Sequence, residues 1–317
     1  RSKYDDFINF DNTVILKDKK THILEGYEGS DKIYGAYNSV NVIYGNTKED
    51  PFGSKGIFNF GSSRDKYGNI IKYDDWLYGG KTTNEELLAS GNLTENHLYG
   101  GRGDDFLLVG YNAHNYLFGG AGEDTLVSAM IGFKNEKAGI DFSYGSSYLN
   151  GGEGIDTYVV KDYVTIEDDD GRGEIQTKYG KLQDLTIKTL SDGTILLLKN
   201  NPMYLDIETI YAPLAGYGSG AFNNILGNVG TTTQGMSLTN YELIFKLQKD
   251  GNDLILNNLT FNPTVIRIKN YTANSLNLNI TQDMLDNLPS LDENINPTPT
   301  NPTLIGTNES ETLIGSE

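Results

Sequence analysis

The chain has 317 residues, which is enough for about two domains and for a buried core. Its 43 acidic and 25 basic residues give a net charge of −18, which excludes nucleic acid as a partner because phosphate backbones are bound by clustered lysine and arginine. The absence of cysteine excludes disulfides and thiolate chemistry, and no apolar run reaches the roughly 18 residues of a membrane-spanning helix.

A nine-residue unit recurs in the first half of the chain: GGxGxD, then any residue, an apolar residue and one more. Incomplete copies come first, each with an aspartate in the sixth position: GYEGSDKIY at 26–34 (Asp31), GNTKEDPFG at 45–53 (Asp50) and DDWLYGG at 74–80 (Asp75). The second copy is the weakest, because Lys48 stands where a glycine belongs and Pro51 removes a strand hydrogen-bond donor.

The repeat is interrupted at 54–72, 81–94 and 128–146, and we expect these segments to be insertions that form loops. Within the second insertion, NEELLASG predicts a short helix with Asn84 as its N-cap and Gly91 closing its C-terminus.

Complete copies of the unit follow: GGRGDDFLL at 100–108, GGAGEDTLV at 119–127 and GGEGIDTYV at 151–159. Degenerate units lie before and between them, and in these Asn96 and Asn115 take the aspartate position. Each unit predicts a six-residue turn followed by a three-residue strand, with the glycines allowing positive φ in the turn. Two units then form one coil of a parallel β-roll.

The central residue of each short strand is expected to point inward and to stack into a narrow core: Leu98, Leu107, Leu117, Leu126, Leu149 and Tyr158. Turns of alternate units stack on the same side of such a roll. The carboxylates of Asp105 and Asp124 should therefore converge with several backbone carbonyls. A set of oxygen ligands of this kind suits Ca²⁺.

These glycine- and aspartate-rich units resemble the RTX (repeats-in-toxin) family of exported bacterial proteins, whose hemolysin-type repeats bind calcium. The resemblance implies that the ligands of several Ca²⁺ ions are the sixth-position aspartates and the turn carbonyls. It carries these roles onto Asp105, Asp124 and Asp156, with weaker copies adding Asp31 and Asp75, and onto the glycines Gly100, Gly101, Gly103, Gly119, Gly120, Gly122, Gly151, Gly152 and Gly154. The alternative is that these are plain turns with solvated carboxylates.

The resemblance also implies a role. It favours a non-catalytic module of a large toxin or exoprotein that a type I secretion apparatus exports, that folds on calcium outside the cell, and that is secreted or held at the bacterial surface. An alternative is the ligand-binding module of an adhesin with a host-cell surface ligand. That function needs an aromatic-lined site in the insertions, and Trp76 is the only tryptophan.

The nonapeptides stop after Val160, so we expect the roll to occupy 1–162 and a β-rich cap to occupy 163–286. LTIKTL-SDGT-ILLLKN and YELIFKLQKDGNDLILNNL predict antiparallel hairpins. This region resembles the segment that covers the open end of the roll in the same family. The run Asp168 to Asp170 is interpreted as a solvated turn, 211–237 as a loop, and 281–288 as a short helix with Thr281 as its N-cap.

Residues 287–302 are rich in proline, asparagine and threonine and are expected to be a linker. The segment 303–317, TLIGTNESETLIGSE, resembles the opening of a further RTX block, with Glu311 near the aspartate position. We therefore expect the chain to be part of a longer protein that carries several such blocks.

No signature of a metalloprotease, a serine hydrolase or a nucleotide-binding loop occurs, so an enzyme is not predicted. His97 and His114 fall beside the degenerate units and are expected on the surface. One catalytic alternative stays open, because irregular RTX toxins of the meningococcal iron-regulated and porcine pleuropneumonia type cleave themselves at an Asp-Pro bond when calcium binds. The chain has one such pair, Asp50 and Pro51.

Overall fold

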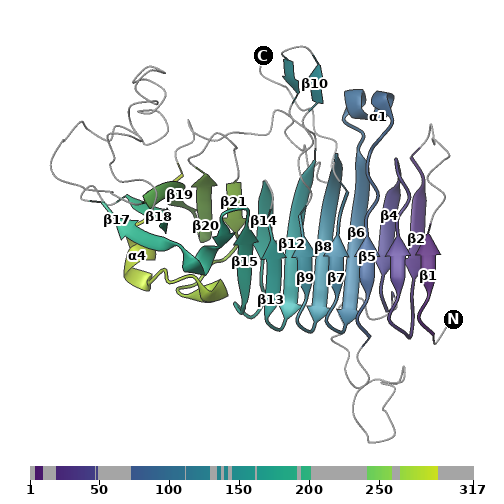
Figure 1. Cartoon of the computed structure of the whole chain (residues 1–317), viewed down its shortest axis with the longest axis horizontal. Helices are drawn as coiled ribbons and strands as arrows, with labels where there is room; N and C mark the ends of the chain where they lie inside the picture. The colour runs from purple at the N-terminus through teal and green to yellow at the C-terminus, as the bar shows by residue number, and fades with distance from the viewer. Residues whose placement is uncertain are drawn as a thin grey trace, which may run out of the picture.

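The structure, a computed structural model, describes residues 4–9, 19–46, 48, 73–110, 112–128, 134–136, 139–141, 145–160, 163–190, 194–200, 241–258 and 265–291. The fold is nearly all β and consists of two long sheets that face each other (Figure 1). This confirms the expected fold class, a parallel roll followed by an antiparallel region. The proposed pair Asp50 and Pro51, the stretch 211–237 and the segments 292–302 and 303–317 lie outside the described residues.

The first sheet contains the short strands that follow the aspartate positions. All neighbours in it are parallel except the last pair. Its strands, in spatial order, are β1 (Phe7–Asn9), β3 (Lys32–Tyr34), β5 (Trp76–Tyr78), β7 (Phe106–Leu108), β9 (Thr125–Val127), β13 (Asp156–Val159), β15 (Gly173–Thr177) and β16 (Gly180–Lys181).

The second sheet holds the longer strands of the roll and then continues into the C-terminal region. Its roll strands are β2 (Thr21–Glu25), β4 (Val40–Tyr44), β6 (Thr94–Arg102), β8 (Ala113–Ala121), β12 (Ser146–Glu153) and β14 (Val164–Glu167). Its C-terminal strands, counted outward from β14, are β21 (Val265–Ile268), β20 (Asp253–Asn258), β19 (Tyr241–Asp250), β18 (Ile195–Asn200) and β17 (Thr186–Thr189).

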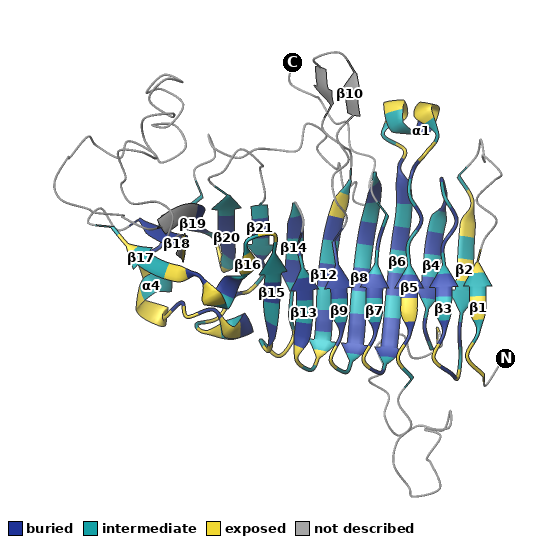
Figure 2. Cartoon of the chain, viewed as in Figure 1, coloured by how far each residue is buried: buried dark blue, intermediate teal, exposed yellow. Residues whose placement is uncertain are grey.

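The core lies between the two sheets, because side chains on successive strand residues point to opposite faces (Figure 2). Every residue expected to point inward is fully buried, and the same column continues into the earlier and later coils: Ile33, Ile43, Leu77, Leu98, Leu107, Leu117, Leu126, Leu149, Tyr158, Ile166 and Ile175. Neighbouring inward positions are eight to ten residues apart except where one of the three insertions intervenes, and this spacing sets the length of each half-coil.

Two rows of turns join the sheets and form opposite edges of the roll. The Asp edge contains the turns that lead into the first sheet and include 26–31, 100–105, 119–124 and 151–156. The Asn edge contains the turns that lead back, and it includes 35–39, 79–93 and 109–112. In Figure 1 the Asn edge is at the top, beside α1, and the Asp edge is at the bottom.

Of the expected insertions, 54–72 lies outside the described residues, 81–94 contains the expected helix, and 128–146 contains a strand pair in place of a plain loop. Helix α1 (Glu85–Ser90) has Asn84 as its N-cap, whose side chain accepts from the N–H groups of Glu86 and Leu87, and it ends at Gly91 in the left-handed conformation. In the third insertion, β10 (Lys134–Glu136) and β11 (Gly139–Asp141) form an antiparallel pair. Among the residues that the structure describes, no helix has the length and apolar character needed to cross a membrane.

The roll extends further than the sequence indicates. β14 pairs in parallel with β12, and β15 pairs in parallel with β13, so one more coil follows Val160. The apolar alternation of this segment fits a parallel coil and an antiparallel hairpin equally well, and DDDGRG lacks the leading glycines of the unit. Only beyond it do the expected hairpins appear, formed by β17 with β18 and by β19 with β20.

The C-terminal region covers the end of the roll. β21 pairs in parallel with β14, and Leu276, in the short 3-10 helix η2 (Ser275–Asn277), lies in the same apolar core as Ile175. The short 3-10 helix η1 (Leu182–Asp184) contributes the buried Leu182. Helix α4 (Gln282–Asp286) begins after Thr281, whose hydroxyl accepts from the N–H of Met284 as expected.

Candidate metal site

A column of buried aspartates runs along the Asp edge, with one residue contributed by each coil. Its members are Asp31, Asp75, Asp105, Asp124 and Asp156, and each is at most 2 % exposed. They come into line because the turns stack in register: Gly101 pairs with Gly120, and Gly120 pairs with Gly152. The sequence units that predicted these residues are therefore brought together as one column, which we call the Asp ladder.

One oxygen of each ladder carboxyl is used by the fold itself. The main-chain N–H of Asp75 donates to Oδ1 of Asp105 at 2.7 Å, that of Asp105 to Asp124 at 2.8 Å, and that of Asp124 to Asp156 at 2.9 Å. The same bond joins Asp31 to Asp75 at 2.7 Å. These bonds connect consecutive coils and fix the direction of every carboxyl group.

The second oxygen has no such partner in most rungs of the ladder. Oδ2 is buried without a hydrogen bond in Asp31, Asp105, Asp124 and Asp156. A buried carboxylate oxygen that is left unpaired is costly, because it has lost its water and gained nothing in exchange. Each of these atoms therefore marks a place where a proton or a cation is required.

The surroundings of the unpaired oxygens have a common geometry. A Cβ atom added at Gly100 would lie 2.3 Å from Oδ2 of Asp105 and 2.6 Å from the carbonyl oxygen of Gly119. A Cβ added at Gly119 would likewise lie 2.3 Å from Oδ2 of Asp124 and 2.6 Å from the carbonyl oxygen of Gly151. The missing side chain of the first glycine thus lets a ladder Oδ2 and the carbonyl oxygen of the next turn come close together, and we call this pair of oxygens a slot.

The other glycines of the units serve the shape of the turns. Gly101, Gly103, Gly120, Gly122, Gly152 and Gly154 all have positive φ, between 98° and 154°. Residues that carry a Cβ rarely adopt this backbone conformation, whereas glycine adopts it without strain. In the incomplete unit at 26–34, Tyr27 takes the second-glycine place with φ of 78°.

Burial raises the pKa of the ladder carboxyls, and the charges of neighbouring aspartates add to the effect. The pKa rises to about 6 for Asp31, about 7 for Asp156, about 8 for Asp75 and about 9 for Asp124, and that of Asp105 is also well above its usual range. Without a cation, Asp75 and Asp124 therefore favour the protonated form at neutral pH, whereas Asp31 at the first coil is mostly ionised. A bound divalent ion reverses this preference, because its charge stabilises the carboxylate.

Asp75 differs from the other rungs, because its Oδ2 accepts a hydrogen bond from the side-chain amide of Asn46 at 3.2 Å. The other end of the same amide, Oδ1, accepts from the N–H of Arg102 at 2.8 Å. Asn46 stands in the second-glycine place of the incomplete unit at 45–53, and sequence reasoning gave it no role. The slot at Asp75 is thus closed by a side chain of the chain itself.

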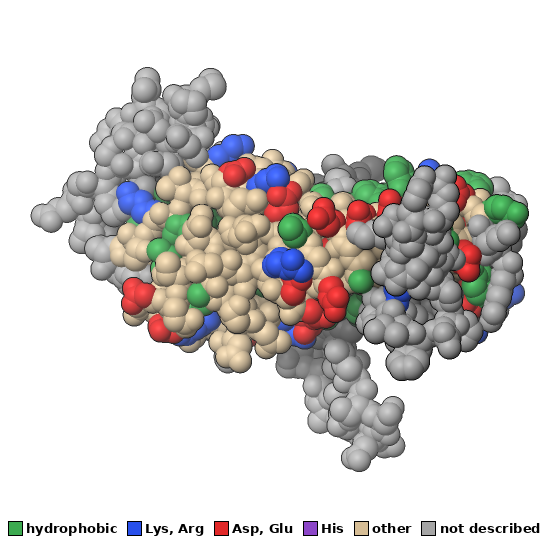
Figure 3. All heavy atoms as spheres, turned by 90° about the horizontal axis from the view of Figure 1, so that it is seen from below, with side chains coloured by type: hydrophobic (Ala, Val, Ile, Leu, Met, Phe, Trp, Pro, Cys, Tyr) green, Lys and Arg blue, Asp and Glu red, His purple; other side chains and the backbone are tan. Residues whose placement is uncertain are grey.

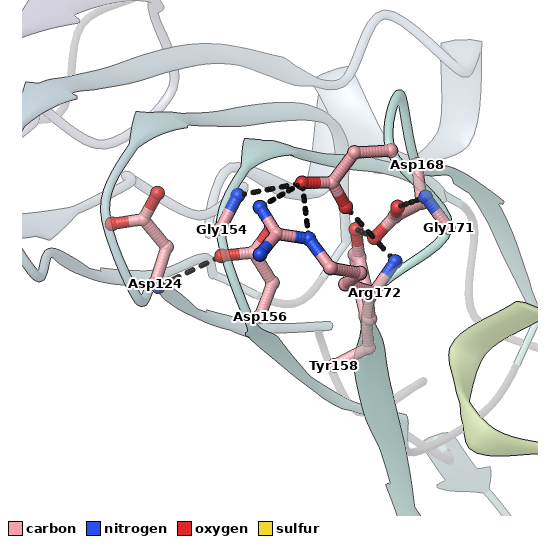
Figure 4. A network of polar contacts seen from close by, with 8 residues as sticks. Asp124, Gly154, Asp156, Tyr158, Asp168, Gly171 and Arg172 are labelled. Atoms are coloured by element: carbon pink, nitrogen blue, oxygen red, sulfur yellow. Dashed lines mark hydrogen bonds and ion pairs between the residues drawn. The ribbon is translucent and has the colours of Figure 1, made fainter.

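The ladder ends at Tyr158 and Asp168 (Figure 4). The hydroxyl of Tyr158 accepts from the N–H of Gly151 at 2.9 Å and donates to Oδ2 of Asp168 at 2.7 Å. A Cβ at Gly151 would lie 2.4 Å from this hydroxyl, which takes the place that a carbonyl of the next turn has in the other slots. The interpretation of 168–170 as a plain solvated turn is therefore wrong for Asp168, which is partly buried and whose pKa burial raises.

The neighbouring residues of that turn are exposed, as expected. Arg172 forms an ion pair with Asp170 at 2.6 Å, and Asp170 also accepts from the N–H of Gly154 at 3.0 Å. Figure 3, which looks onto the Asp edge from below, shows acidic side chains gathered on this face. Cations approaching the ladder therefore meet a negative surface.

The donor set fits a hard cation. Calcium prefers carboxylate and carbonyl oxygens in flexible geometry, and each slot but that of Asp156 brings one carboxylate oxygen toward one main-chain carbonyl. Among the described residues, no group of three or more acidic or histidine side chains lies close enough to hold an ion alone. An ion on the ladder therefore needs further oxygen ligands besides these side chains, and the carbonyls of the turns lie beside them.

The other residues that the sequence singled out lie apart from the ladder. His97 contacts Glu95 at 2.6 Å and His114 contacts Ser146 at 3.0 Å, both on the outer face of the second sheet. Trp76 is on β5, 49 % exposed, so it lies on the roll and not in an insertion. Comparisons of the chain with family models, with curated proteins and with solved structures find no match.

Proposed function

We propose that this chain is a calcium-binding module whose roll is completed by Ca²⁺ ions held along the Asp ladder. The single observation that carries the proposal is the row of buried, unpaired Oδ2 atoms, each set over a glycine. For Asp31, Asp105 and Asp124 a carbonyl of the next turn lies beside this oxygen, and for Asp156 the hydroxyl of Tyr158 does. In a plain turn such an oxygen would need a proton at neutral pH, whereas a cation satisfies the carboxylate in its ionised form.

The proposed role follows from the affinity that such sites have. Calcium modules of extracellular proteins bind at about 10⁻⁴ to 10⁻³ M, so they stay empty where calcium is scarce and fill where it is abundant. We propose that the parent protein is exported by a type I secretion apparatus and that the module folds outside the cell, as the RTX resemblance implies. The acidic net charge of −18 supports this order of events, because the unfilled chain repels itself.

The direct test is a calcium titration of the purified chain, followed by circular dichroism and by calorimetry. We expect calcium at submillimolar to millimolar concentration to complete the β structure cooperatively and to raise the melting temperature above that of a partly ordered, calcium-free chain. Magnesium should have much less effect, because it demands a strict octahedral set and keeps its waters. The matched variants are Asp124→Ala, which removes a ladder carboxylate, and Glu123→Ala, which removes the exposed carboxylate beside it. Equal calcium affinity in both variants would overturn the proposal.

A further inference from the structure

The Asn edge carries a second ladder, built from amides. Its members are Asn41, Asn96 and Asn115, each at most 1 % exposed, and they pair in register across β4, β6 and β8. The side-chain nitrogen of Asn41 donates to Oδ1 of Asn96 at 2.9 Å, and that of Asn96 donates to Oδ1 of Asn115 at 2.8 Å. The chain of bonds runs from coil to coil, as on the Asp edge.

The two ladders occupy equivalent places. A Cβ at Gly79 would lie 2.7 Å from the carboxamide carbon of Asn96, and a Cβ at Gly35 would lie 2.8 Å from that of Asn41. On the Asp edge the first glycine of a turn faces the carboxyl group of Asp124 or Asp105 in the same way. The amide and the carboxylate are thus alternative occupants of one position in the repeat.

The difference between them lies in the hydrogen bonds. Asn96 accepts from the N–H of Gly80 at 2.9 Å and donates to the carbonyl of Gly80 at 2.8 Å, besides its bond to Asn115. An amide has two donors and a carbonyl oxygen, whereas a carboxylate can only accept. The amide therefore satisfies a carbonyl of its own turn, whereas the carbonyl beside a ladder Oδ2 belongs to the next turn. No side-chain atom of Asn41, Asn96 or Asn115 is left buried and unpaired.

Asn46 shows the same replacement on the Asp edge itself, since its amide nitrogen donates to Oδ2 of Asp75, the one ladder oxygen of this kind that has a partner. Two independent places in the roll thus use an amide where the neighbouring rungs leave an oxygen open. Both places lie in degenerate copies of the repeat, and in both the amide and the group beside it have hydrogen-bond partners.

We propose that side-chain amides close slots of this roll without metal, so that calcium is confined to the slots of Asp31, Asp105, Asp124 and Asp156 while the Asn edge holds the coils in register in its absence. This inference rests on the proposed calcium function for the identity of the ion. The claim that amides take the place of the metal is separate, because it predicts differences in stability in excess chelator, where no calcium is bound.

The first test exchanges the two groups in both directions. In Asp124→Asn the new amide can accept from the N–H of Asp105 as the carboxylate does, and it gains a donor toward the carbonyl of Gly151. We expect its melting temperature in excess chelator to exceed that of the wild type by about 3 °C or more and to rise less on adding calcium. Asp124→Ala, which has neither donor nor acceptor, should show no gain over the wild type from hydrogen bonding and serves as the comparison.

The reverse exchange, Asn96→Asp, puts a carboxylate opposite the carbonyl of Gly80 and Oδ1 of Asn115. We expect a lower melting temperature in chelator and a larger rise with calcium than in the wild type. Asn92→Asp adds the same charge at an exposed site and should change neither. If Asp124→Asn is no more stable in chelator than Asp124→Ala, the inference is wrong.

The second test counts ions. Asn46→Ala removes the amide that closes the Asp75 slot, so calorimetry should find one more calcium per chain than in the wild type. Asn150→Ala removes an amide that contacts Asp169 at 3.4 Å outside the slots and should leave the count unchanged. An unchanged count in Asn46→Ala would contradict the closure of that slot. A wild type that ignores calcium altogether would instead refute the proposed function, and the chelator comparison would still decide the role of the amides.

Discussion

The main-chain N–H of Asp105 donates to Oδ1 of Asp124 across 2.8 Å, and the two residues are 19 positions apart in the chain. This bond holds one oxygen of the carboxyl group within the scaffold and leaves the other facing a slot. The carboxyl groups are therefore positioned before any ion arrives, which reduces the ordering that binding requires. The fold does not determine whether the carboxyl group is protonated or ionised at its second oxygen.

The first prediction concerns pH in the absence of calcium. Aspartates ionise near pH 4 in an unfolded chain, but the ladder pKa values reach about 6 to about 9 in the fold. Between pH 4 and pH 9 the folded chain thus holds more protons than the unfolded chain, so the free energy of unfolding falls as the pH rises. We expect the melting temperature in chelator to decrease steadily from pH 5 to pH 9.

Calcium should remove most of this decrease, because it stabilises the ionised ladder. The control is the same series in saturating calcium, where the curve should be nearly flat over that range. Below about pH 4 a different effect sets in, since carboxylates with lowered pKa, such as Glu167 beside Lys269, lose their ion pairs there. A melting temperature in chelator that rises from pH 5 to pH 9 would contradict the first prediction.

The second prediction ranks the aspartates of the ladder by how much each contributes to calcium binding. Asp124 lies between two ladder residues with open slots, Asp105 and Asp156, and its neighbouring turns have complete glycines. Asp124→Ala should raise the calcium concentration at the folding midpoint about tenfold. The substitution removes a full negative charge from a site whose other ligands are mainly carbonyl dipoles. Asp31→Ala, at the first coil, should have a smaller effect. Titrations that show the reverse order would disprove the ranking.

The third prediction tests a slot by substituting the first glycine of its turn. In Gly119→Ala the new Cβ would lie 2.3 Å from Oδ2 of Asp124, which is closer than real contacts allow. The carboxyl group must then move, so we expect loss of the ion at that rung and destabilisation by about 1–3 kcal/mol. Gly251→Ala is the control, since its Cβ meets no atom within 4 Å and carries only the strain of φ at 59°, about 1 kcal/mol. Equal calcium binding in both variants would show that the slot holds no ion.

The nine-residue spacing predicted the roll well, because each half-coil must return an inward residue to the same column. Leu107 and Leu126 follow from it directly, and so do the ladder positions of Asp105 and Asp124. The spacing could not reveal the partners that close the ladder. Asn46 lies 29 residues from Asp75, and its contact depends on where the intervening insertion returns the chain.

The end of the roll was equally hidden from the sequence. Tyr158 occupies an inward position, where a leucine elsewhere only fills the core, and its hydroxyl finds Gly151 and Asp168 through the geometry of the last turn. Nothing in the alternation of β14 and β15 distinguishes a parallel coil from a hairpin. Pairing direction is set by what lies beside the strand, and for β14 that is β12 on one side and β21 on the other.

The last prediction concerns this terminal contact. Tyr158→Phe keeps the ring in the core but leaves the N–H of Gly151 and Oδ2 of Asp168 without their partner. The loss of two buried hydrogen bonds should cost about 1–3 kcal/mol in chelator. Calcium should restore little of it, because the slot of Asp156 has then lost the hydroxyl that takes the place of a carbonyl there. Tyr179→Phe is the comparison, since it lies in the C-terminal region, away from the ladder, and its hydroxyl accepts a bond from the amide of Asn258 at 3.2 Å. Chemical unfolding of both variants, with and without calcium, measures the difference. A Tyr158→Phe chain that is as stable as Tyr179→Phe in chelator would show that the ladder ends without help from the tyrosine.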